Sequence, residues 1–221
     1  FRRGGEGVIY LDLVLHGPTG LDAGDKFAIK FNKNTFALVP KKGTFVTGDG
    51  PVADRVARQV SLEIGVDANY ANPGAAPNLT VEMAMKVQKT SAVVYFSARL
   101  PFHVLFVESP RAIPNPDQAW INAAASTAME EATVAGGFDA TAVAGVFREN
   151  RVMPLTPAYD FFSLATSTGS NVLVRLAPPS TIQARCVQKQ VLPFVMEALV
   201  ELAESAPKPT ASASSTMVPA D

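Results

Sequence analysis

The chain has 221 residues, of which 48% are apolar, and its formal net charge is −1 at pH 7. A chain of this length and apolar content can bury one large core or two smaller ones, which excludes general disorder. Its 19 basic and 20 acidic residues are scattered along the chain, whereas phosphate binding needs clustered Lys and Arg, so we expect no nucleic-acid partner.

The first half of the sequence predicts β-strands. It begins at Phe1 without a signal-peptide pattern, and we interpret it as a piece from the C-terminal part of a longer chain. In the stretch "DKFAIKFNKNTFALVP", the alternate residues Phe27, Ile29 and Phe31 predict the inward face of a strand that breaks at Asn-Lys-Asn, residues 32–34. Further period-two or short apolar segments lie at 8–15, 58–66, 79–87, 92–100 and 103–108.

Two of these segments show their inward faces clearly. The inward residues are Val60, Leu62, Ile64 and Val66 in one, and Leu79, Val81, Met83, Met85 and Val87 in the other. Turn signals such as "HGPTG", "GDGP" and "ANPGAAPN" separate the strands. This spacing favours an N-terminal antiparallel β-sandwich of the immunoglobulin-like kind over residues 1–109.

The pattern changes after residue 109 and predicts a small α/β subdomain over 110–206. Asn115 and Asp139 are expected helix N-caps, the first followed by Pro116 at the first helical position. The segments 161–167 and 171–177 predict a hairpin, and 181–187 predicts a strand. A closing helix begins near Leu192 and presents Val195, Leu199 and Leu202 to a sheet. The predicted fold class is α+β.

The closing stretch 191–206 is the longest apolar candidate for a membrane span. It contains three glutamates and reads as amphipathic, so we expect no spanning helix and only indirect membrane contact. From 207 to 221 the chain is rich in Pro, Ser and Ala, and we expect a disordered tail.

Signals for catalysis, metal binding or a cofactor are weak. Cys186 is the only cysteine, which excludes an intrachain disulfide and is typical of a reducing compartment. The two histidines, His16 and His103, lie far from any metal-ligand pattern, and His103 sits in an apolar segment where a structural role is expected. No dinucleotide, phosphate-loop or nucleophile-elbow motif is present. We therefore expect no catalytic residue, metal or cofactor, although a carboxylate-based hydrolase stays an alternative.

Trp120 is the only tryptophan, and it lies in a predicted helix of otherwise small and polar residues. It can serve as the apolar anchor that an amphipathic helix needs, which is the structural interpretation. It can also line a shallow groove that takes an aromatic side chain of a partner. Composition leaves both interpretations open.

Two long segments resemble the C-terminal appendage, or ear, of the beta-adaptins of clathrin adaptor complexes. These are "FAIKFNKNTFALVP" and "VVYFSARLPFHVLFVE" (93–108), and the distance between them in the sequence matches that in the family's domain. The short segments "NLTVEM" and "RC" show a weaker resemblance. The similarity runs from about Gly7 to Glu204 and is strong as far as Glu108. It implies a β-sandwich followed by a platform subdomain, and it implies that the break at 32–34 is a bulge or turn with a scaffolding role.

The resemblance implies a peptide-binding surface on the platform. Trp120 falls at the position of the family's tryptophan, which favours the groove. Its neighbours depart from the family pattern: Ile121 replaces a lysine, Phe161 a tyrosine, Ala158 an arginine, and Arg175 a glutamate. We therefore expect an aromatic floor with an altered rim, whose partners carry Asp or Glu in place of an arginine.

The resemblance implies a second surface on the side of the sandwich. Tyr95 matches a tyrosine that the family uses for clathrin and accessory proteins, and Val93 lies two residues earlier on the same strand face. The family's nearby lysine aligns with Gln88, although Lys86 or Lys89 can supply the charge. We expect a partly exposed Tyr95 ring.

These resemblances imply a non-enzymatic interaction appendage that recruits accessory proteins and clathrin during vesicle formation and cargo sorting. The implied location is the cytoplasmic face of coated pits and vesicles, with the other adaptor subunits reached through the upstream chain. Two alternatives remain: a structural spacer whose platform does not bind peptides, and a two-domain hydrolase.

Overall fold

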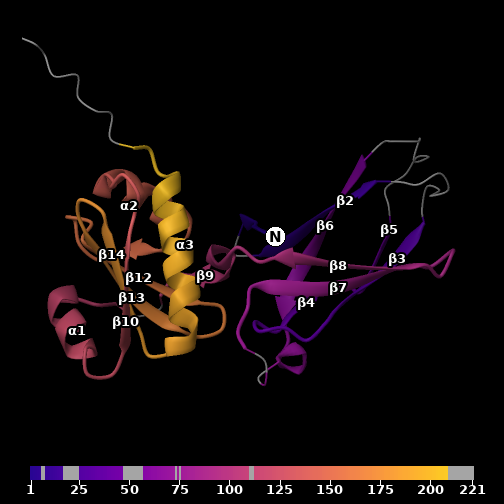
Figure 1. The fold of residues 1–221 in the computed structure, drawn as a ribbon, viewed down its shortest axis with the longest axis horizontal. Helices are drawn as coiled ribbons and strands as arrows, with labels where there is room; N and C mark the ends of the chain where they lie inside the picture. The colour runs from indigo at the N-terminus through magenta and orange to yellow at the C-terminus, as the bar shows by residue number, and fades with distance from the viewer. Residues whose placement is uncertain are drawn as a thin grey trace, which may run out of the picture. The chain divides into compact units, whose positions relative to one another are not determined.

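The computed structural model describes residues 1–5, 8–16, 25–46, 57–72, 74, 76–109 and 112–208 (Figure 1). The chain is mixed α+β with mostly antiparallel sheets and few helices, as the sequence predicts. It divides into two compact units, Phe1–Leu105 and Phe106–Asp221. This division falls slightly before the expected end of the first subdomain at residue 109, and the expected tail lies outside the described residues from 209 onward.

The first unit contains two antiparallel sheets of four strands each among its described residues. One sheet has the order β1 (Arg2–Arg3), β2 (Ile9–His16), β6 (Ala57–Val66) and β4 (Leu38–Pro40). The other has the order β5 (Thr44–Val46), β3 (Lys26–Phe31), β7 (Thr80–Val87) and β8 (Val93–Arg99). The chain therefore leaves one sheet after β3, joins the other as β4, and returns as β5.

The inward faces of these strands agree well with the period-two predictions. Phe27, Ile29 and Phe31 of β3 are all buried, and β3 pairs with β7 so that Phe31 lies beside Met83. Val66, predicted to face inward, is instead 50% exposed because it lies at the end of β6, beyond the buried Ile64.

The prediction of a strand over residues 103–108 is wrong for most of that segment. Residues Phe102–Leu105 form a 3-10 helix, and only β9 (Phe106–Val107) is a strand. Phe102, Val104 and Leu105 are all buried. A short run that is apolar on every side does not distinguish a strand from a helical turn by its periodicity.

Asn34 explains the polar break in the opening stretch of the chain. Its side chain is buried, donates from Nδ2 to the Leu38 carbonyl at 2.9 Å, and accepts from the Leu38 N–H at 2.9 Å. Its backbone N–H donates to the Tyr70 carbonyl, and its carbonyl accepts from Asn72 N–H. The break is thus a turn, one of the two predicted possibilities, and it holds the chain where β3 passes into β4.

The second unit is built on one six-stranded sheet. Its order is β10 (Ala128–Thr133), β14 (Thr181–Cys186), β13 (Asn171–Ala177), β12 (Phe161–Thr166) and β11 (Met153–Pro154), with β9 also pairing with β12. The predicted hairpin is β12 and β13. Strand β10 was not predicted, because Ala and Glu have low strand propensity.

The described residues of the second unit form three α-helices beside this sheet: α1 (Pro116–Ala123), α2 (Ala140–Glu149) and α3 (Leu192–Ser205). The predicted caps are confirmed, since Asn115 Oδ1 accepts from Gln118 N–H and Asp139 Oδ1 from Ala142 N–H. The three predicted inward residues of α3 are buried, and α3 packs against β10 and β14 (Figure 1).

Two glycines of the second unit give a matched pair of stability predictions. Gly137 has φ +71°, and a Cβ at this position would lie 2.8 Å from the Pro179 carbonyl oxygen. Gly145, inside α2, has open space around it. We expect Gly137→Ala to destabilise the unit by about 2 kcal/mol, and Gly145→Ala to stabilise it by about 0.5–1 kcal/mol. Urea unfolding followed by Trp120 fluorescence measures both, and equal effects of the two changes would contradict this reading.

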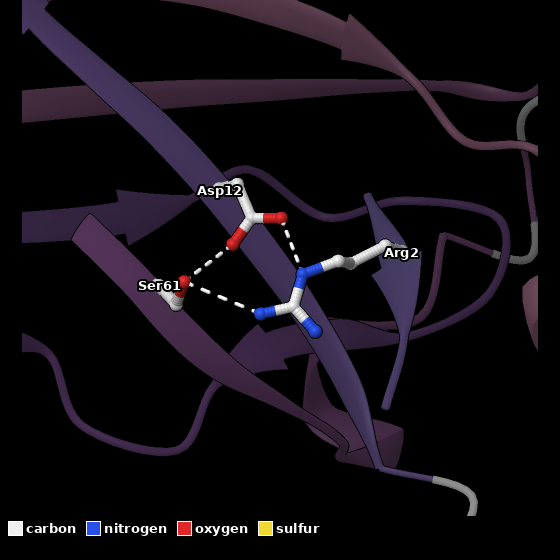
Figure 2. A network of polar contacts seen from close by, with 3 residues as sticks. All are labelled: Arg2, Asp12 and Ser61. Carbon is white, nitrogen blue, oxygen red and sulfur yellow. Dashed lines mark hydrogen bonds and ion pairs between the residues drawn. The ribbon is translucent and has the colours of Figure 1, made fainter. Parts of the chain in front are cut away.

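A small polar network joins three strands of the first unit (Figure 2). Asp12 of β2 accepts from Arg2 Nε at 2.6 Å and from the Ser61 hydroxyl of β6, while Arg2 also lies over the Tyr10 ring. The Ser61 hydrogen bond, aided by Arg2, holds the pKa of Asp12 below its ordinary value, although partial burial opposes this.

This network predicts an acid-dependent loss of stability. A carboxyl whose pKa is lowered on folding stabilises the fold above its unfolded pKa of about 3.9 and loses that contribution as the pH falls through its folded pKa. In Ser61→Ala we expect the Asp12 pKa to rise toward its ordinary value, measured by carbon NMR of the carboxyl. The stability difference between wild type and Asp12→Asn should also shrink as the pH falls below about 4. An unchanged Asp12 pKa in Ser61→Ala would refute the assignment.

Candidate protein-interaction surfaces

Tyr95 stands on the outer side of β8, the last strand of its sheet. It is 80% exposed, the highest value among the large apolar and aromatic residues of the described chain, and Val93 is exposed beside it. Alternation along β8 puts Val93 and Tyr95 on one face. The predicted exposure of the Tyr95 ring is confirmed and exceeds the expectation.

Strand pairing sets the surroundings of Tyr95. Ala84 of β7 lies directly opposite Tyr95, and Lys86 lies opposite Val93. On β3, the strand on the other side of β7, Ala28 lies opposite Lys86 and Lys30 lies opposite Ala84. Small alanines next to a large exposed ring leave the ring standing above the sheet, with exposed lysines around it.

We refer to Tyr95, Val93, Ala84, Lys86 and Lys30 as the Tyr95 surface. The structure brings together three residues predicted for this side, Tyr95, Val93 and Lys86. Gln88, also predicted, is exposed just beyond the end of β7. The sequence did not nominate Lys30 or Ala84, because their place depends on the register between β3, β7 and β8.

The second predicted surface centres on Trp120 of α1, and here the structure differs from the expectation. Trp120 is only 8% exposed and packs in a cluster with Phe161 and Leu173. The Trp120 and Phe161 rings meet edge to face with centroids 6.1 Å apart. The expected open aromatic floor is corrected: Trp120 is a core anchor for α1 on the sheet, the other interpretation that composition left open.

Two arginines lie over this aromatic pair. The Arg185 guanidinium is 4.8 Å from the Trp120 ring centroid, and the Arg175 guanidinium is 5.6 Å from that of Phe161. Cation–π contacts of this kind hold a guanidinium flat against a ring. Arg185 was not predicted as a site residue, since only its pairing opposite Leu173 brings it beside the cluster.

The remaining predicted platform residues are accessible. Ile121 is 64% exposed on α1, while Ala158 and Arg175 are also exposed. Arg175 of β13 lies opposite Gln183 of β14, and Gln183 lies opposite Glu131 of β10. The Gln183 side-chain amide donates to the Glu131 carboxylate at 2.6 Å. The rim therefore carries both charge signs, and sequence reasoning missed Glu131 because it did not predict β10.

In the part of the chain that the structure describes, no three His, Cys, Asp or Glu side chains gather as metal ligands. Within the same ranges, no helix has the length and apolar character needed to cross a membrane.

Burial raises the pKa of the Cys186 thiol, which lies in β14. This environment keeps the thiol protonated and unreactive.

No family model matches the chain, and no curated protein matches it.

Proposed function

We propose that the chain is a protein-interaction appendage of a clathrin adaptor beta chain, which recruits accessory proteins and clathrin during vesicle formation and cargo sorting. The observation that carries this proposal is the Tyr95 surface, where an 80% exposed tyrosine stands among lysines on an open sheet face. Aromatic rings that expose both a flat apolar body and a hydroxyl are common anchors of protein interfaces.

The proposal includes a more specific description of the fold. We infer that the two sheets of the first unit are an immunoglobulin-like β-sandwich, and that the second unit, a sheet with α1 and α3 packed on it, is the platform. The two resembling segments, 27–40 and 93–108, supply β3, β4 and β8 of the first unit. The proposed place of action is the cytoplasmic face of coated pits and vesicles, together with the other subunits of the adaptor complex.

The test is a pull-down from cytosol of the source cell with the purified 221-residue chain. We expect wild type to retain clathrin and endocytic accessory proteins, and Tyr95→Ala to retain at least fivefold less, because a central aromatic anchor dominates a small interface. Val14→Ala, which changes an exposed valine of β2 outside the Tyr95 surface, is the matched control. Retention of neither class of protein by wild type would overturn the proposal.

A second candidate function is a structural spacer whose second unit does not bind peptides. The burial of Trp120 beneath Arg185 favours this candidate for that unit. The variants Ile121→Ser and Arg175→Glu distinguish the two candidates. Both residues are exposed, and neither is one of the buried residues that pack around Trp120. If accessory-protein binding is unchanged in both variants while Tyr95→Ala abolishes it, the spacer role holds for the second unit.

A further inference from the structure

A groove of about 620 Å³ opens in the first unit where the chain passes from one sheet to the other. Its walls come from β2, β5 and β6 and from the turn between β4 and β5. Its lining includes Lys41, Lys42, Phe45, Val46, Val60 and Ser61. None of these residues belongs to the Tyr95 surface, so this groove is a separate site.

The groove exists because β4 is much shorter than its partner β6. Strand β4 pairs only with residues 64–66 of β6, and Lys41 N–H then donates to the Glu63 carbonyl. The chain turns away at once, since the Gly43 carbonyl accepts from Ile29 N–H in the other sheet. Among the described residues, the edge of β6 from residue 59 to residue 62 therefore has no strand beside it opposite β2.

The backbone groups of Ser61 face the groove, and those of Gln59 face the same edge of β6 just beyond the lining residues. In an antiparallel ladder, alternate residues direct their N–H and C=O groups to the same side. Because the Glu63 carbonyl faces β4, the backbone groups of Ser61 and Gln59 face the same edge. The Asp12–Ser61 side-chain hydrogen bond agrees with this, since side chains approach most closely at pairs that do not exchange backbone hydrogen bonds.

The side chains of the groove define what can lie there. Val60 and Leu62 point to the inner side of β6, where half-buried Phe45 stacks on Phe27 with centroids 5.2 Å apart. An added strand would meet apolar side chains at alternate positions along this side. At the β4 end, Lys41 is paired with Glu63, while exposed Lys42 has no ion-pair partner among the described residues.

We propose that this groove binds an extended, acidic and aliphatic segment of a partner protein by strand addition to β6. The segment runs antiparallel to β6 and continues the line of β4. Its backbone exchanges hydrogen bonds with Ser61 and Gln59, its alternate aliphatic side chains meet Val60 and Phe45, and a carboxylate near its start meets Lys42. Main-chain pairing of this kind gives affinity, while the alternate side-chain sites give specificity. The proposal does not rest on the adaptor function.

The experiment measures amide hydrogen exchange and binding in the full 221-residue chain. The probe is the synthetic peptide acetyl-Glu-Asp-Val-Thr-Val-Thr-Val-amide. We expect saturable binding that slows exchange at the Ser61 and Gln59 amides. Methylation of the peptide nitrogens that face β6 should weaken binding at least tenfold, because it removes the donors that strand addition uses.

Two variants and a matched control test the side chains. Val46→Lys and Lys42→Glu should each weaken binding about tenfold, the first by placing a charge in the apolar wall and the second by like-charge repulsion. Val14→Lys changes a valine of similar exposure, 56% against 51% for Val46, outside the groove and should change affinity less than twofold. Circular dichroism verifies that all three variants remain folded.

Several results would overturn the proposal. Equal binding of the methylated peptide would show that the backbone edge is not used. Slow exchange at the Ser61 amide in the free chain at low concentration would show that the edge is already covered. A concentration-dependent dimer that protects Ser61 without peptide, and that Val46→Lys abolishes, would assign the groove to a second copy of the chain.

Discussion

Trp120→Ala should destabilise the second unit by about 3–5 kcal/mol, the usual cost of removing a large buried aromatic side chain. The ring is 8% exposed and fills the cluster between α1 and the strands that carry Phe161 and Leu173. Its removal leaves a cavity and also takes away the surface on which the Arg185 guanidinium rests. Urea unfolding followed by far-ultraviolet circular dichroism gives the free energy, because the variant has no tryptophan to report fluorescence.

The control for this prediction is Trp120→Phe, which keeps an aromatic ring against Phe161 and should cost clearly less. Hydrogen exchange at the β12 and β13 amides locates the effect, and the β2 and β6 amides should stay unchanged. If Trp120→Ala keeps wild-type stability and loses only partner binding, the ring is a binding residue and its assignment as a core anchor is wrong. Any binding loss in Trp120→Ala must therefore be judged against its folding.

Asn34→Ala should destabilise the first unit by about 3 kcal/mol. The change removes the amide that satisfies both the N–H and the carbonyl of Leu38, a residue with no exposed surface. Each buried backbone group that loses its partner costs about 1–3 kcal/mol. Circular dichroism in urea measures the loss, while Trp120 fluorescence should show an unchanged transition for the second unit.

Asn32→Ala is the matched control, two residues earlier in the same turn. Its amide donates to Glu82 Oε2 at 3.0 Å, but this contact is exposed to water. An exposed hydrogen bond contributes little, so we expect a cost below about 1 kcal/mol. If Asn32→Ala and Asn34→Ala have equal effects, the burial of Asn34 does not explain the polar break.

Much of this architecture could be predicted from local patterns. Alternation identified the buried face of β3, and cap residues located the starts of α1 and α2, because both signals depend on residues close in sequence. The same reasoning placed the exposed Tyr95 correctly only with the help of the resemblance, since a strand aromatic can face either way.

The features that sequence reasoning missed depend on contacts between distant segments. The Arg185 guanidinium lies over the Trp120 ring. It reaches the ring only because the register between β13 and β14 places Arg185 opposite Leu173. Glu131 joins the rim through the pairing of β10 with β14. The open edge of β6 arises from the shortness of β4, a length that no local pattern determines.

The path of β3, β4 and β5 has a consequence for how the first unit unfolds. Within residues 26–46 the chain belongs first to one sheet, then to the other, and then to the first again. The two sheets cannot separate far without breaking the pairing of β4 in one sheet or of β3 and β5 in the other, because the chain crosses between the sheets twice within this short segment. The unit should therefore open as one cooperative block, with the amides of β6 and β7 becoming exchangeable together.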